Sequence, residues 1–383
     1  PSEDLLDFVY KVNRKRKHPQ AERDWDAGMD CLRRSRRSTW WEWSDGSRPY
    51  FWRWPEEYQE IIRDGLPIWE LDTLPTWLVP QRGEKVPYMH EAVRLKLIVV
   101  RGRRYIIAGT VKSLTSLFAV PKGETDIRLV YDGTKSGLNK AVWAPWFPLP
   151  TVESHLRCVE VGTFMGDIDI GEMFLNFMLH PRMQPYAGVD VTPFFPEELE
   201  LTESERRFIW EHWGRCGMGF RFSPYQAVQG VLFADMEIRG DRFDASSIFR
   251  WDRVILNLPG SSTYSPARSW VYKVRSDGVL ASDFSIYVDD VRTMGNTVED
   301  ERLASRAVAS ILNSLGFQDA ARKRRDGSQT PGAWAGSIVH TSDGVVSISV
   351  SQERWDKAKV ILAWVNNHLQ SGSDIPFKPL ESH

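Results

Sequence analysis

The stretch FSIYVDDVRTM, residues 284–294, decides the fold of this 383-residue chain. Apolar residues flank the paired carboxylates Asp289 and Asp290 in a pattern that predicts two strands joined by a tight turn. Adjacent carboxylates on such a turn repel each other, and the arrangement is costly unless a cation neutralises it. Mg²⁺, which binds carboxylate oxygens together with substrate phosphates, suits this position. Taken by itself, YVDD is equally compatible with an ordinary surface turn.

A second acidic stretch, DIDIGEMF at residues 167–174, lies upstream at the end of a predicted strand. Two-metal phosphoryl transfer requires a carboxylate from a second strand that bridges both ions. Asp167 and Asp169 alternate onto the same face of this strand, so periodicity does not choose between them. Either is also compatible with an aspartate that merely ends a strand.

Local patterns elsewhere predict a mixture of strands and helices. Short apolar runs predict strands at 95–100, 104–108, 117–120, 127–131, 164–170, 333–340 and 344–350. Helical spacing predicts helices at 197–213, 223–237, 297–316 and 355–369. The third of these begins with a capping-box pattern at Thr297 and Asp300, and Gly316 ends it.

The composition is that of a globular protein larger than one ordinary domain. No run of ~18 apolar residues exists, and the first residues lack the order of a secretory signal, so we expect no membrane association. The chain begins with Pro rather than Met, which suggests an excerpt of a longer polyprotein with further domains. Its 3 cysteines are scattered without a C-x-x-C pair, which argues against a disulfide scaffold or a structural zinc site. A reducing intracellular location, cytoplasm or nucleus, fits this usage.

Two regions differ from the rest in composition. Residues 1–90 hold eight of the 17 tryptophans and two basic blocks, 11–17 and 33–37. These side chains could contact bases and phosphates, or they could form a docking surface and solvated tails. Residues 238–280 are rich in Gly, Ser, Pro and Arg, which indicates an insertion.

Several motifs together resemble the reverse-transcriptase domain of retroviruses and of LTR-type and related retroelements. The motifs, in the order in which that family has them, are LFAVPK at 117–122, IRLVYD at 127–132, LN at 138–139, FLNFMLHP at 174–181, GFRFSP at 219–224, YVDD at 287–290, LGF at 315–317 with Arg322-Lys323, and WAG at 334–336. The resemblance covers about 115–350.

The resemblance implies an α+β right-hand polymerase with a mixed or antiparallel palm sheet plus helices. It implies a Trp/Arg-rich extension at 1–94, fingers at 95–147 and 186–217, a palm at 148–185 and 218–350 that includes the insertion 238–280, and the start of a thumb at 351–383. The implied reaction is RNA- or DNA-templated transfer of a nucleotide from a dNTP to a primer 3′-hydroxyl. Its implied cofactors are two Mg²⁺ ions, with Mn²⁺ as a substitute, and its implied partner is a primer–template, either RNA/DNA or DNA/DNA.

The resemblance also assigns the metal ligands and a sugar gate. In the family an aromatic residue follows the first metal-binding aspartate by five positions, a spacing that Asp169 and Phe174 satisfy. Asp169 is then the bridging ligand beside Asp289 and Asp290. Phe174 would pack beneath the sugar, where a 2′-hydroxyl would clash, which implies deoxynucleotide substrates.

Further residues correspond to nucleotide contacts of the family: Lys122, Arg128, Ile170, Gly219 and Tyr287. The first two fit the pair that clamps the triphosphate, because Arg binds phosphate oxygens bidentately and stacks on a base. The glycine would let the backbone approach the nucleotide. Lys323 is the candidate acid that protonates the leaving pyrophosphate, and Arg322, Arg324 and Arg325 are alternatives for that role. Lys323 is also compatible with being one of several solvated basic residues on a loop.

Two other functions remain open. An RNA-dependent RNA polymerase shares the palm, but Phe174 argues against ribonucleotide substrates. A catalytically impaired relic that only binds nucleic acid is favoured by Met218, which stands where the family usually has Gln, and by the short thumb. Retention of the three aspartates argues against a relic.

Overall fold

The computed structural model describes residues 90–122, 126–142, 145–200, 208–317 and 323–375. The chain divides into two compact units, the first from 1–148, 172–234 and 312–318, the second from 149–171, 235–311 and 319–383. The tryptophans and basic blocks of the first 89 residues lie outside the described residues. Within the described part of the chain, no helix is both long and apolar enough to span a membrane.

The first unit contains two separate antiparallel sheets and several helices. Strands β1 (Ile106–Ala108), β6 (Trp210–Trp213) and β5 (Gly188–Asp190) pair in the order β1-β6-β5, and β2 (Ser116–Lys122) pairs with β3 (Asp126–Asp132). The helical segments are α4 (His90–Gly102), α5 (Leu138–Ala141), η3 (Met173–Asn176), η4 (Gln184–Tyr186), α7 (Glu197–Glu200) and the first part of α8 (Ser223–Arg239). The strands predicted at 117–120 and 127–131 are confirmed as the paired β2 and β3, and the helix predicted to begin at Ser223 is confirmed as α8.

Two predictions for this unit are wrong. The run at 95–100 is not a strand but part of α4, where Val93, Leu97 and Val100 are buried at helical spacing. Of the helix predicted over 197–213, residues 197–200 form α7, residues 201–207 lie outside the described residues, and 210–213 is instead the central strand β6. In both segments tertiary packing overrides local preference. Strand β6 pairs with β1 and β5, and its residues Glu211 and Trp213 are buried.

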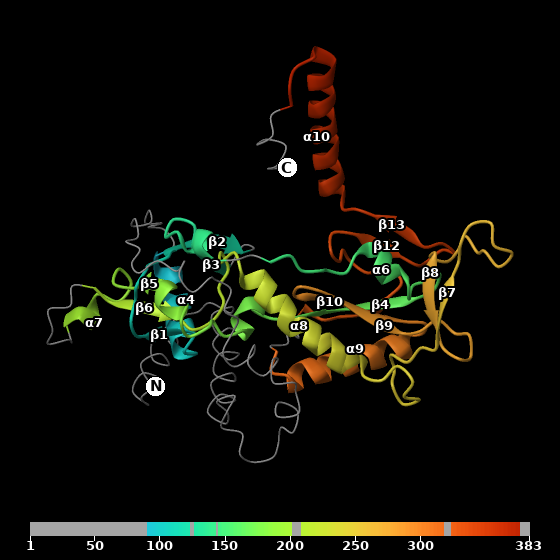
Figure 1. Ribbon diagram of the computed structural model, residues 1–383, viewed down its shortest axis with the longest axis horizontal. Helices are drawn as coiled ribbons and strands as arrows, with labels where there is room; N and C mark the ends of the chain where they lie inside the picture. Colours follow the sequence, from blue (N-terminus) through green and yellow to red (C-terminus); the bar gives the residue numbers. More distant parts are fainter. Residues whose placement is uncertain (1–89, 123–125, 143–144, 201–207, 318–322, 376–383) are drawn as a thin grey trace. The chain divides into compact units, whose positions relative to one another are not determined.

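The second unit is built on a four-stranded antiparallel sheet in the order β11-β4-β10-β9. Its strands are β4 (Phe164–Asp169), β9 (Asp283–Tyr287), β10 (Asp290–Gly295) and β11 (Arg325–Ser328). Figure 1 shows β4, β10 and β9 side by side in this unit. The strands predicted around 164–170 and 284–294 are thereby confirmed.

The two faces of this sheet are covered by different elements, as side-chain alternation requires. Met165 and its cross-strand neighbour Met294 pack with Cys158, which follows α6 (Val152–Leu156), and with Val339 of β12 (Ile338–His340). The next pair along the ladder points the other way, and Thr293 there donates to Glu301 of α9 (Val298–Ser314). The sheet is therefore a layer with α6 and β12 on one side and α9 on the other (Figure 1).

The remaining elements are two hairpins and a terminal helix. Strands β7 (Arg253–Leu256) and β8 (Val271–Val274) form a hairpin in the expected insertion, and β12 pairs with β13 (Ser347–Ser349). Both strands of the second hairpin are shorter than predicted. Helix α10 (Gln352–Ser371) confirms the last predicted helix, although none of its residues is buried.

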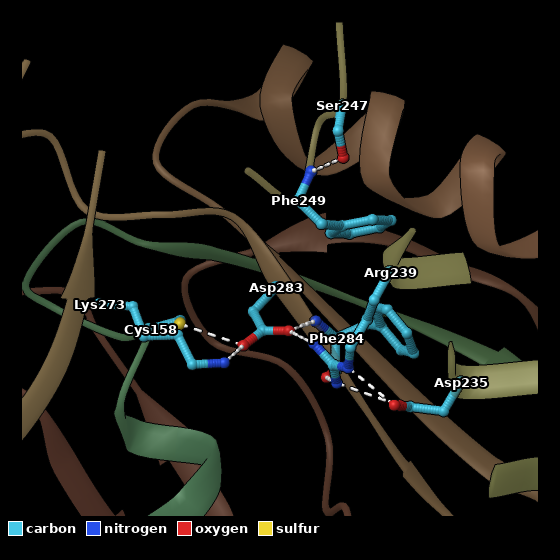
Figure 2. A network of polar contacts seen from close by, with 8 residues as sticks. All are labelled: Cys158, Asp235, Arg239, Ser247, Phe249, Lys273, Asp283 and Phe284. Carbon is cyan, nitrogen blue, oxygen red and sulfur yellow. Dashed lines mark hydrogen bonds and ion pairs between the residues drawn. The ribbon is translucent and has the colours of Figure 1, made fainter. Parts of the chain in front are cut away.

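An ionic network around the buried Asp283 fastens β8 and the end of α8 to the start of β9. Asp283 accepts from Lys273 Nζ at 2.9 Å, from Cys158 Sγ at 3.3 Å and from Arg239, which also binds Asp235 at 2.7 Å (Figure 2). Burial alone raises the pKa of the Asp283 carboxyl, but the two cations outweigh it and lower the pKa to about 2. This pairing anchors the β7–β8 hairpin to the central sheet.

Candidate metal centre

Three carboxylates converge at one end of the four-stranded sheet. Asp169 ends β4, Asp290 begins β10 directly opposite it in the ladder, and Asp289 lies in the turn between β9 and β10. One oxygen from each lies within 4.8 Å of the others, and the described residues contain no other such group of three or more ligand side chains. The amide of Ile170 donates to the carbonyl of Asp289 at 2.9 Å and so ties the two strand ends together.

The turn that carries Asp289 is strained. Tyr287 and Asp290 pair directly, so the connection has two residues, and Val288 adopts a φ of 58°. A β-branched side chain is rarely found in this left-handed region, because its Cβ substituents crowd the backbone. Such strain persists only where surrounding contacts hold it, and it concentrates at functional sites.

Trp334 supplies one of those contacts. Its Nε1 donates to the carbonyl of Asp290 at 3.1 Å, and its ring meets that of Tyr287 edge to face at a centroid distance of 6.2 Å. The indole is buried. Trp334, which precedes β12 in the chain, therefore holds the turn that carries Asp289 in place.

The electrostatics of the cluster suit a cation. Burial, and then the charges of Asp289 and Asp169, raise the pKa of Asp290. Lys323 Nζ lies 2.7 Å from Asp169 Oδ1 and partly offsets this repulsion. Three carboxylates whose oxygens lie within 4.8 Å of one another concentrate negative charge at this end of the sheet, and a hard divalent ion coordinated by oxygen would neutralise it. The residues present therefore fit a site for Mg²⁺ or Mn²⁺.

Asp167, the alternative that periodicity left open, has different partners. Its Oδ1 accepts from Arg292 Nε at 2.6 Å, and its Oδ2 lies 3.9 Å from Arg325 Nη1. Asp167 is thus paired with arginine, whereas Asp169 belongs to the carboxylate cluster. Sequence reasoning missed Arg292; the only signal was an arginine within the apolar run Val291–Met294.

A cleft of about 440 Å³ opens beside the cluster. Both carboxylates and cations line it, and the charged lining residues are Asp167, Asp169, Asp290, Lys323, Arg324 and Arg325. Trp334 completes the wall. This mixed lining suits a polyanionic ligand that binds together with metal ions.

The first unit holds the candidate triphosphate clamp. Arg128 lies opposite Val120 in the β2–β3 ladder, and Lys122 lies two residues beyond Val120. Since side chains alternate along a strand, Lys122 and Arg128 lie on the same face of the hairpin. Both are exposed.

Phe174 and Gly219 also lie in the first unit. Phe174 is half-buried in η3, whose N-cap residue Glu172 adopts a φ of 48° and forms an ion pair with Arg103 at 2.5 Å. Gly219 has a φ of 105°, and a Cβ there would lie 2.0 Å from the carbonyl oxygen of Tyr131. Strand β3 itself therefore requires a glycine at position 219, independently of any nucleotide.

Comparison with solved structures identifies the fold. The chain is similar to a foamy viral protease–reverse transcriptase in complex with double-stranded DNA, with 16% sequence identity and a TM-score of 0.52 over 77% of this chain and 41% of that one. It is similar to the same kind of protein in complex with an RNA/DNA hybrid, with 15% identity and a TM-score of 0.50 over 79% and 33% of the two chains. At this identity the likeness shows the fold alone, and the chain spans less than half the length of these proteins. No protein-family profile and no curated protein matches the sequence.

Proposed function

We propose that this chain is a reverse transcriptase of a retroelement, which copies an RNA or DNA template by transferring nucleotides from dNTPs to a primer 3′-hydroxyl. The observation that carries the proposal is the cluster of Asp169, Asp289 and Asp290, gathered from the end of β4, the β9–β10 turn and the start of β10. It occurs in a fold similar to that of foamy viral protease–reverse transcriptases. Together they support a polymerase active site more specifically than either does alone.

Asp169, Asp289 and Asp290 would hold two Mg²⁺ ions, which supply Lewis acidity toward the 3′-hydroxyl and the phosphate oxygens. The chain's own cations complement them. Lys122 and Arg128 would bind the triphosphate, and Arg presents a planar fork that fits phosphate oxygens. Lys323, an ammonium beside the carboxylates, would donate the proton that pyrophosphate needs on leaving.

Phe174 would contact the sugar of the incoming nucleotide and exclude a 2′-hydroxyl by its bulk. Ile170, Tyr287 and Gly219 would complete the nucleotide contacts. The amide of Ile170 donates to the carbonyl of Asp289. This hydrogen bond would hold Ile170, and with it the base of the nucleotide, in place relative to the metal ligands.

The decisive experiment is primer extension on an RNA template, with dNTPs and with rNTPs, in Mg²⁺ and in Mn²⁺. We expect extension with dNTPs only. Asp289→Asn should abolish it, because an amide does not replace the lost negative charge. Asp343→Asn is the matched control, since Asp343, like Asp289, lies in a strained turn between strands (its own φ is 60°) but outside the carboxylate cluster.

A second experiment addresses the sugar gate. Phe174→Val should raise incorporation of rNTPs relative to dNTPs by about 10-fold or more, because the change removes a steric clash rather than a binding contact. An unchanged ratio would assign Phe174 to packing only. A folded wild-type chain that binds primer–template but extends it under no condition would instead support the nucleic-acid-binding relic.

A further inference from the structure

A fully buried arginine, Arg292, joins three segments behind the metal centre. It lies two residues beyond Asp290 on β10 and opposite Asp167 of β4, and its side chain is 0% exposed. Its Nε donates to Asp167 Oδ1 at 2.6 Å, and its Nη2 donates to the carbonyl of Gly332 at 2.9 Å. One guanidinium therefore holds β4, β10 and the segment that leads into Trp334.

That segment continues into a strained turn. The amides and carbonyls of Trp334 and Ser337 exchange hydrogen bonds of 2.8 and 2.9 Å, with Ala335 at φ 47° and Gly336 at φ 83° between them. Positive φ at both central residues is the geometry of a tight two-residue turn, which alanine adopts only under constraint. Trp334 Nε1 in turn binds the carbonyl of Asp290. Two strained turns, this one and the one that carries Asp289, are thus linked through Trp334.

We propose that Arg292 is a positioning residue that fixes the Gly332–Ser337 turn against the strand carrying Asp290, with Asp167 as its counter-ion. The consequence for catalysis rests on the proposed function. Trp334 and Asp290 line the same cleft, so a shift of the turn moves the cleft wall relative to the metal ligands. A substrate oriented by that wall would then be misaligned with the carboxylates.

The role requires arginine rather than a generic positive charge. The planar guanidinium binds a carboxylate with one nitrogen and a carbonyl with another, in a fixed geometry. A lysine at 292 would keep the charge beside Asp167 but would not hold both oxygens in that geometry. Arg292→Lys therefore separates positioning of the turn from mere charge compensation.

The chain offers a matched control in Arg239. This arginine lies in the same unit and binds two aspartates, Asp235 and Asp283, and one backbone carbonyl, that of Phe284, at 2.9 Å (Figure 2). Among the described residues, the polar partners of Arg239 are these three, and none of them belongs to the Gly332–Ser337 turn. Arg239→Lys thus removes a guanidinium that also joins carboxylates to a carbonyl, and it leaves the Gly332–Ser337 turn untouched; the Arg239 side chain is 34% exposed, whereas that of Arg292 is 0% exposed.

The first measurement is hydrogen–deuterium exchange of the peptide that spans Gly332–Ser337, without substrate. In Arg292→Lys the amides of Trp334 and Ser337 should exchange about 10-fold faster or more, because local opening becomes easier. Arg239→Lys should leave them at the wild-type rate. If Arg292→Lys does not fold, the double variant Asp167→Leu/Arg292→Met replaces it, because removing both charges together avoids an unpaired buried ion.

The second measurement is single-nucleotide incorporation with burst kinetics. The rate per active site should fall by about 10- to 100-fold in Arg292→Lys while the burst amplitude is retained, since misalignment slows each competent enzyme. A merely structural role would lower the amplitude and leave the rate, which is the behaviour expected of Arg239→Lys.

Unchanged exchange of the turn overturns the proposal, and so does a loss confined to burst amplitude. If the wild type extends no primer while exchange rises in Arg292→Lys, the proposed function fails and the positioning role of Arg292 stands. If the wild type extends primers and exchange is unchanged in Arg292→Lys, the polymerase assignment stands and the positioning role of Arg292 fails.

Discussion

His155, in α6, is expected to make the protein acid-sensitive well above the pH at which carboxylates titrate. The side chain is 1% exposed and packs against Trp334 at a ring distance of 5.0 Å. Among the described residues, neither ring nitrogen has a hydrogen-bond partner. Burial, and then the positive charge of Arg292, lower its pKa from 6.5 to about 3, against a smaller opposing effect of Asp283.

The magnitude follows from the difference between the folded and unfolded pKa. Because the folded pKa is depressed, the stabilisation is fully present above pH 6.5 and is lost as the pH falls toward 3. At pH 7 only about a quarter of the unfolded histidine is protonated, whereas at pH 5 nearly all of it is. Between those two pH values His155 should lower the free energy of unfolding by about 2 kcal/mol.

The assay is urea denaturation of the wild type and of His155→Phe at pH 7 and at pH 5. The drop in unfolding free energy between the two pH values should be about 2 kcal/mol smaller in the variant, since phenylalanine keeps an aromatic ring against Trp334 without titrating. Calorimetry at pH 5 should show that unfolding of the variant takes up about one proton fewer. Equal pH dependence and equal proton uptake in the two proteins would refute the reasoning, because His155 would then be protonated in the folded state.

Three further predictions concern other described residues. Because burial and neighbouring carboxylates raise the pKa of Asp290, protons should compete with Mn²⁺ above the usual aspartate range; titration calorimetry should show affinity falling early as the pH drops from neutrality, and a flat profile would contradict this. Arg103 pairs with Glu172, the N-cap of the segment η3 that carries Phe174, so Arg103→Gln should lower the discrimination between dNTPs and rNTPs several-fold. Glu172→Gln should give a similar loss in the same incorporation assay, and the two losses should not add; additive losses would show that the two residues act separately. Gly219→Ala should lower the free energy of unfolding in urea by about 3 kcal/mol, since it adds a collision to backbone strain. Gly162→Ala, which has a positive φ but open space, should lose only about 1 kcal/mol; equal losses would exclude the collision.

Much of the local structure around the candidate site was predictable because its signals are short-range. The alternation of apolar residues around Asp289 and Asp290 predicts both strands and the turn, and the sequence places β4 correctly. The cap of α9 was also predictable from the sequence, and in the structure Thr297 Oγ1 accepts from the amide of Asp300 at 3.0 Å. Each of these features depends on residues within a few positions of one another.

The errors occurred where distant packing decides the structure. The run at 95–100 has β-branched residues typical of a strand, yet it forms a helix because its buried positions face the rest of the first unit at helical spacing. The segment at 210–213 reads as part of a helix, yet it is the central strand β6 because β1 and β5 occupy both of its edges. Neither set of neighbours can be identified from the segment's own sequence.

The sequence by itself determined that paired carboxylates lie on a hairpin and that an acidic strand precedes them. Only the tertiary structure decided how those charges are paired. Asp167 and Asp169 share one face of β4, but Arg292 binds the first from the adjacent strand, whereas the second meets Asp289 and Asp290. Periodicity reports the face on which a side chain lies, while the partner it meets there depends on strand register, which residues far apart in the chain set together.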